Sequence, residues 1–243
     1  MNPAVPTFNL IVDGVVVVGA AGLAVRGRWR LSLFFSAYLV SILGREILVV
    51  FWPERFFFLR FWFIFQSIHD ILKFGIALEV AWRTFRAFPG ASAAAKRVVV
   101  LILGLTAVSV ASLPLAIPGT TVIETAVTTF HPRLSDGTIW LMAAILVMAK
   151  WYHVPVHRFH TGVLTSLAVY LLFFTSVLRL FVGRDFEVIR HYVNAIDPIG
   201  FALVTCWWAR IAWRSENGED RVHMDTLKAL RLRRAATASG PSL

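Results

Sequence analysis

Seven long apolar runs dominate the sequence and constrain its fold more than any other feature. A helix needs about 20 mainly apolar residues to cross the hydrocarbon core of a bilayer, and each run is close to that length. Because backbone groups in lipid must find hydrogen bonds within their own segment, helices are expected. The sequence predicts an all-α, polytopic membrane protein, a seven-transmembrane-helix bundle with spans near Phe8–Val25, Leu31–Trp52, Phe56–Trp82, Val98–Ile117, Thr138–His153, Thr161–Val182 and Ile189–Trp213.

The composition agrees with this interpretation. Hydrophobic residues make up 58% of the 243 residues and charged residues only 16%, whereas soluble domains average about 25% charged. The N-terminal stretch MNPAVPTFNLIVDG has no basic region and no small-residue cleavage site, so we expect no signal peptide. Cys206 is the single cysteine, which excludes an internal disulfide and a cysteine metal cluster.

The distribution of basic residues predicts the orientation. Of the 24 Lys and Arg residues, 15 fall in the loops and tail on one side of the predicted bundle, and six on the other. By the positive-inside rule, the N-terminus lies outside and the C-terminus in the cytoplasm, as a multi-pass protein of the cell inner (plasma) membrane. The same asymmetry accounts for the net charge of +10 without a nucleic-acid partner.

The chain divides into a transmembrane domain, residues 1–213, and a short basic cytoplasmic tail, residues 214–243. The tail is too short for a catalytic output domain. Its stretch VHMDTLKALRLRRA can form one basic helix, which could lie on anionic lipid or dock a protein partner. A solvated end fits this sequence equally well. No internal repeat supports an inverted-repeat transporter.

Polar residues inside the spans are costly unless they are paired or hydrated, so they are candidate functional residues. Counted from the outer helix ends, six of them lie roughly 5–15 Å deep at 1.5 Å per residue. We expect them to form an outer polar layer, centred on Arg45, that binds a small-molecule or lipid ligand. Its members are Asp13, Arg45, Glu46, Gln66, Asn194 and Asp197.

A second group of charges lies deeper. Asp70 and Lys73 are three residues apart and can pair along one helix, and Lys150 is expected at a similar depth. These three residues form a predicted buried charge cluster, facing the bundle interior along a helical stripe. Glu79 and Arg83, four residues apart, can pair at the inner end of the same helix. Such pairs also serve simply to fix helix packing, and this structural role stays open.

Three histidines within eight residues, His153, His157 and His160, are a weak candidate for a metal site. Pro155 breaks the helical spacing between the first two, and no cysteine or carboxylate is near, so a polar interfacial loop is favoured. His69 alone lies mid-membrane, which argues against a haem held by two histidines. The last span has no lysine for retinal. We therefore expect no cofactor, and the absence of catalytic motifs argues against an enzyme.

Two stretches carry a resemblance to a known group of proteins. The run FWFIFQSIHDILKFGIALEVAWRTFRAFPG resembles a helix of poorly characterised bacterial seven-helix integral membrane proteins, and HTGVLTSLAVYLLFFTSVLRLFVG looks like their sixth span. These proteins resemble the membrane input modules of bacterial sensory proteins, some of which carry a kinase behind the last helix. The matching positions are Gly75, Glu79, Arg83, Phe85 and Pro89 in the first stretch, and Gly162, Tyr170 and Arg179 in the second.

The resemblance and the polar residues together predict a sensory or regulatory module without its own catalytic output domain. It would signal through its inner loops and basic tail to a separate cytoplasmic or membrane partner. Two alternatives stay open: an accessory subunit of a larger membrane complex, and a small proton-coupled transporter that uses Asp70, Lys73 and Lys150.

Overall fold

The computed structural model describes residues 4–56, 58–86, 88–112, 130–154, 156–180 and 186–214, some of them by their backbone alone. Within these ranges every regular element is helical. The elements are α1 (Ala4–Val25), η1 (Arg28–Arg30), α2 (Leu33–Phe51), α3 (Pro53–Phe56), α4 (Leu59–Phe85), α5 (Pro89–Ala111), α7 (His131–Trp151), α8 (Arg158–Leu180) and α9 (Phe186–Trp213).

A long helix overlaps each of the seven apolar runs. Five of these helices, α2, α4, α5, α7 and α8, are long and apolar enough to cross a membrane. The chain is thus a helical protein with the character of a membrane protein. In α1 the apolar stretch Leu10–Val25 is shorter.

Two helices begin seven or more residues earlier than the apolar runs predicted. α5 starts at Pro89 rather than Val98, and α7 starts at His131 rather than Thr138. Each has a proline in its first turn. Proline suits this position because its fixed φ is helical and its missing N–H has no helical partner there. The stretches FPGASAAAKR and HPRLSDG, which look like loops, are therefore helix starts.

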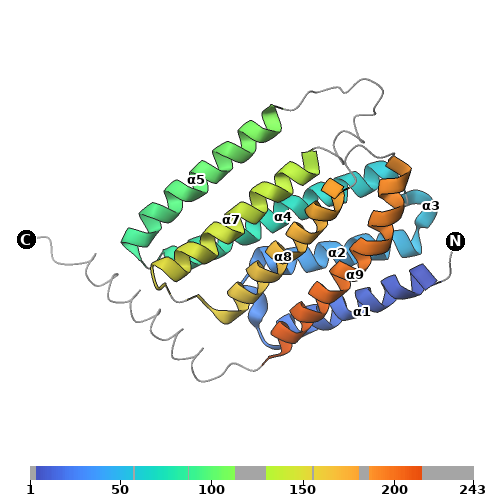
Figure 1. Ribbon diagram of the computed structural model, residues 1–243. Helices are drawn as coiled ribbons and strands as arrows, with labels where there is room; N and C mark the ends of the chain where they lie inside the picture. The colour runs from blue at the N-terminus through green and yellow to red at the C-terminus, as the bar shows by residue number, and fades with distance from the viewer. Residues whose placement is uncertain are drawn as a thin grey trace, which may run out of the picture.

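The long helices lie side by side in a bundle, with α5 at one edge and α1 at the other (Figure 1). α1 packs against α9, α2 against α4, and α7 lies between α5 and α8 while also contacting α4. α4 therefore sits between helices from both halves of the chain. This central position matters because α4 carries most of the polar residues considered below.

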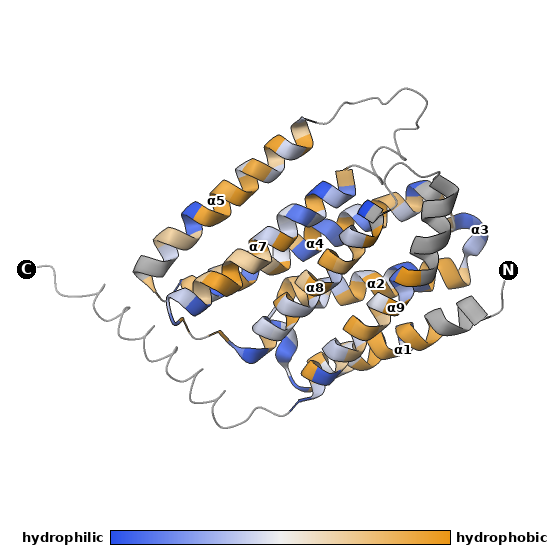
Figure 2. Ribbon diagram, in the orientation of Figure 1, coloured by the Kyte–Doolittle hydropathy of each residue, from blue (hydrophilic) through white to orange (hydrophobic). Residues whose placement is uncertain are grey.

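The interior of the bundle is apolar and tightly packed. The Phe35 ring meets Phe159 and Trp208 edge-on, with centroids 5.8 and 5.3 Å apart, and Ile76 and Leu141 are fully buried. The outer surface is also apolar: Leu203, for example, is 70% exposed. Figure 2 shows hydrophobic residues along the middles of the helices and many hydrophilic ones toward their ends. An apolar exterior of this kind suits a lipid environment.

Candidate functional site

A buried carboxylate, Asp70 of α4, is the centre of the candidate site. Its Oδ1 accepts hydrogen bonds from Lys73 Nζ at 2.8 Å and from Gln66 Nε2 at 3.3 Å. Its Oδ2 lies 2.6 Å from Nδ1 of His131, the first residue of α7. Asp70, Lys73 and His131 are each at most 5% exposed. We call Gln66, Asp70, Lys73 and His131 the Asp70 cluster.

The Asp70 cluster arises from two local features of the sequence. Gln66, Asp70 and Lys73 follow the helical repeat of α4, so their side chains share the face of α4 that turns inward. His131 reaches Asp70 because α7 begins at this residue and packs against α4. The cluster therefore ties α4 to a helix that is distant in the sequence.

The surroundings of His131 are aromatic. The rings of Phe63, Phe130 and Trp62 meet it edge-on, with centroids 5.5, 5.9 and 6.2 Å away. Its Nδ1 can only donate to the ionised carboxylate, so Nε2 of the neutral ring carries a lone pair. This Nε2 is buried and has no hydrogen-bond partner in the described part of the chain.

A second imidazole lies on the neighbouring position of α4. His69 is 5% exposed, and its ring meets that of Tyr38 from α2 edge-on at 5.3 Å. Its Nε2 is likewise buried without a partner among the described residues. Each buried polar atom of this kind calls for an explanation, because most such atoms in folded proteins are hydrogen-bonded.

The structure brings together most of the predicted outer polar layer. Arg45 and Glu46 of α2 pair directly, Nε to Oε1 at 2.8 Å. Asp13 of α1 is half-buried and interacts electrostatically with both. Asp197 of α9 accepts a hydrogen bond from the Tyr170 hydroxyl of α8 at 2.7 Å.

This layer is continuous with the Asp70 cluster rather than separate from it. Asp197 interacts electrostatically with both Arg45 and Lys73. Gln66, predicted in the outer layer, instead hydrogen-bonds Asp70. The side chain of Asn194 lies outside the described residues. We define the polar network as the charged residues of both groups together with His131: Asp13, Arg45, Glu46, Asp70, Lys73, His131 and Asp197.

Lys150 does not join the Asp70 cluster, and its predicted place there is corrected. It is exposed in the last turn of α7, whereas His131 opens that helix. A helix of 21 residues is about 30 Å long, so the two residues lie at opposite ends. The depth estimate failed because α7 begins seven residues earlier than its apolar run.

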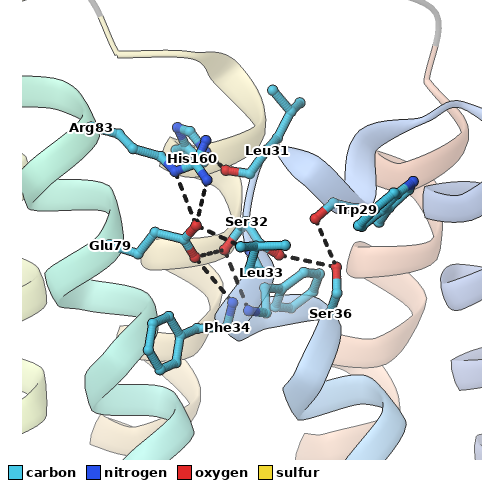
Figure 3. Close-up of polar contacts among 10 residues, drawn as sticks. Trp29, Leu31, Ser32, Leu33, Phe34, Ser36, Glu79, Arg83 and His160 are labelled. Carbon is cyan, nitrogen blue, oxygen red and sulfur yellow. Dashed lines mark hydrogen bonds and ion pairs between the residues drawn. The ribbon is translucent and has the colours of Figure 1, made fainter.

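A second buried carboxylate, Glu79, forms a distinct site nearer the other end of α4 (Figure 3). Its Oε1 accepts from the backbone N–H of Leu33 at 3.1 Å, and its Oε2 from that of Phe34 at 3.1 Å and from the Ser32 hydroxyl at 3.0 Å. Arg83 donates through Nε at 3.0 Å. Glu79 thus caps the start of α2, where backbone N–H groups lack helical partners.

The three candidate metal ligands have other partners or lie apart. His157 Nδ1 accepts from the backbone N–H of Phe159 at 3.2 Å, and His160 Nε2 lies 2.9 Å from the Leu31 carbonyl oxygen. His153 is exposed. Among the described residues, no three His, Cys, Asp or Glu side chains are grouped to hold a metal ion.

Sequence reasoning missed His131, the residue that completes the Asp70 cluster. It lay between two predicted spans, in a stretch that looked like a loop. The signal that could have identified it is the proline that follows, since His-Pro before a helical pattern marks a helix start. The resulting Asp–His contact can hold or exchange a proton.

Comparison with known proteins provides no relative from which to transfer a role. No protein-family model, curated protein or solved structure matches the chain.

Proposed function

We propose that the chain is a seven-helix sensory or regulatory module of the cell inner membrane, with its N-terminus outside and its C-terminus in the cytoplasm. It passes a change in helix packing through its inner loops and basic tail to a separate protein partner. The observation that carries this proposal is the Asp70–His131 contact, a buried polar link between two long helices.

The charge distribution supports the proposed orientation. One end of the bundle, where α1, α4, α7 and α9 end, carries many basic residues. Within the described part of the chain, Glu79 is the acidic residue near this end. Exposed tryptophans stand beside some of these arginines: Arg30 lies over Trp29, and Arg86 over Trp82. Aromatic and basic residues at this level are typical of the cytoplasmic membrane interface. The basic residues are Arg26, Arg28, Arg30, Arg83, Arg86, Lys96, Arg97, Lys150, Arg158, Arg210 and Arg214.

The positions of the two α4 sites support a mechanism for signalling. A ligand can shift a protein between states only by as much as it interacts differently with them. A change in the strength of the Asp70–His131 contact would change how firmly α4 and α7 are held together. The Glu79 cap would still hold α4 to the start of α2. We therefore expect α7 to move relative to α2 and α4, which stay together. This movement would change the positions of the basic helix ends at the cytoplasmic side.

The proposal is tested by measuring that movement. Cys206 is the single cysteine, so Cys206→Ser provides a cysteine-free background. Spin labels at Trp82→Cys and Trp151→Cys, both exposed at the same end of α4 and α7, report their separation in lipid nanodiscs. We expect Asp70→Asn to shift the distance distribution, whereas Ile71→Ala, at an exposed neighbouring position, leaves it unchanged. An unchanged distance in Asp70→Asn would contradict the proposed coupling.

The orientation needs its own measurement. A membrane-impermeant maleimide applied to intact cells should label Glu54→Cys in α3 but not Lys150→Cys, both in the Cys206→Ser background. The reverse pattern would overturn the proposed topology.

A further inference from the structure

The polar network contains more acidic groups than fixed positive charges. Its carboxylates are Asp13, Glu46, Asp70 and Asp197, and its fixed cations are Arg45 and Lys73. These groups are close enough to act on one another electrostatically. Uncompensated charge is costly inside an apolar bundle. The network can therefore accept a proton, at one of its carboxylates or at His131.

His131 is placed to hold that proton. Its Nδ1 already holds the Asp70 carboxylate at 2.6 Å, so a proton added at Nε2 leaves this contact intact and converts it into an ion pair. The Nε2 atom has no hydrogen-bond partner among the described residues.

The charged groups on the neighbouring helices do not replace His131 in this role. From α4, Asp70 and Lys73 face it. On α8, Arg179 is paired with Asp136 of α7. On α5, Lys96 and Arg97 lie in the half away from this end, and the Ser109 carbonyl and the Ser112 hydroxyl bind Arg133 of α7. From α9, Asp197 acts electrostatically on Lys73, and from α2, Arg45 acts electrostatically on Asp197.

We propose that the Asp70–His131 pair is a membrane-buried proton-binding site, and that proton uptake is the trigger of the module. A proton from the aqueous phase forms an N–H bond at His131 Nε2, and the charge of the polar network rises by one. The identification of the trigger rests on the proposed function; the proton-binding site itself does not.

The first experiment observes the proton directly. The full-length protein, labelled with ¹⁵N-histidine, is placed in lipid nanodiscs, and its ring nitrogens are followed by NMR from pH 8 to pH 5, the range in which histidine ordinarily titrates. The chain has seven histidines, and His131→Gln identifies the signal of interest. We expect Nε2 of His131 to change from unprotonated to protonated in one step.

Two further variants test the assignment of the NMR signal to His131. Trp62→Leu alters the ring environment of His131 without removing it, and identifies the same signal if His131→Gln does not fold. His69→Gln removes the neighbouring imidazole and should leave the His131 step in place. A His131 Nε2 that remains in one protonation state throughout would overturn the proton-binding site.

The second experiment separates the site from its proposed role. The distance between the labels at positions 82 and 151 is measured over the same pH range. A shift that follows the His131 step, and is absent in His131→Gln, supports the proton as trigger. A His131 step without any shift keeps the site but overturns the trigger. A shift in Asp70→Asn without a His131 step keeps the module and overturns the proton-binding site.

Discussion

Asp70 and Glu79 are buried carboxylates on the same helix, yet their surroundings differ in kind. Glu79 receives two backbone N–H groups and a hydroxyl from the start of α2, and its charge is balanced by Arg83 one turn away. Asp70 is bound by Lys73 and by a histidine whose other nitrogen is unpartnered among the described residues. The comparison teaches that buried charge alone does not indicate function. Glu79, whose charge is balanced by Arg83, caps the start of α2. Asp70 belongs to a network with more carboxylates than fixed cations, and such a network can take part in a change of state.

The largest expected effect comes from removing Asp70. Asp70→Ala leaves Lys73 buried without its carboxylate, and breaking a buried pair in this way costs about 3–5 kcal/mol. The free energy of unfolding, measured by denaturant titration in mixed micelles, should fall accordingly. Asp70→Ala combined with Lys73→Met should recover most of the loss because no unpaired charge remains. Equal losses in the single and double variants would show that the ion pair does not dominate this site.

Removal of the Glu79 cap should have the next largest effect. Glu79→Ala deletes several charge-assisted hydrogen bonds, and we expect a loss of about 2–4 kcal/mol in the free energy of unfolding, given about 1.5–3 kcal/mol for one such bond. Amide hydrogen exchange should accelerate at Leu33 and Phe34. The separation of labels between α4 and α7 should stay as in the parent protein. If Glu79→Ala moved α7 as much as Asp70→Asn does, the distinction between the two sites would fail.

A smaller effect is expected where the polar network meets α8. Tyr170→Phe removes the hydroxyl that donates to Asp197, at a cost of about 1 kcal/mol in the free energy of unfolding. Val169→Ala, at an exposed neighbouring position, is the matched control and should cost less. A Tyr170→Phe variant as stable as its parent would indicate that Asp197 finds another donor.

The smallest effect is expected at Lys150. Because this side chain is exposed at the far end of α7, Lys150→Gln should change the free energy of unfolding by less than about 0.5 kcal/mol. It should also leave the His131 titration unchanged. A loss comparable with that of Asp70→Ala would place Lys150 in the polar network after all.

The positions of the helices could largely be predicted from the sequence. Length and apolarity act locally, so each apolar run becomes a helix whatever its neighbours are. The inward stripe of α4 could be predicted for the same reason, since Asp70 and Lys73 share a face through helical geometry alone. The early starts of α5 and α7 were missed because their first turns are polar or small, and apolarity rather than proline marked the predicted boundaries.

The sequence by itself determined a helical membrane protein with a charged stripe on its third long helix. Only the tertiary structure decided which partner completes that stripe, because His131 is 61 residues from Asp70 along the chain. The choice between His131 and Lys150 depends on where α7 begins and how it is positioned against α4. No local pattern contains that information, since helix packing follows from the fit of many side chains at once.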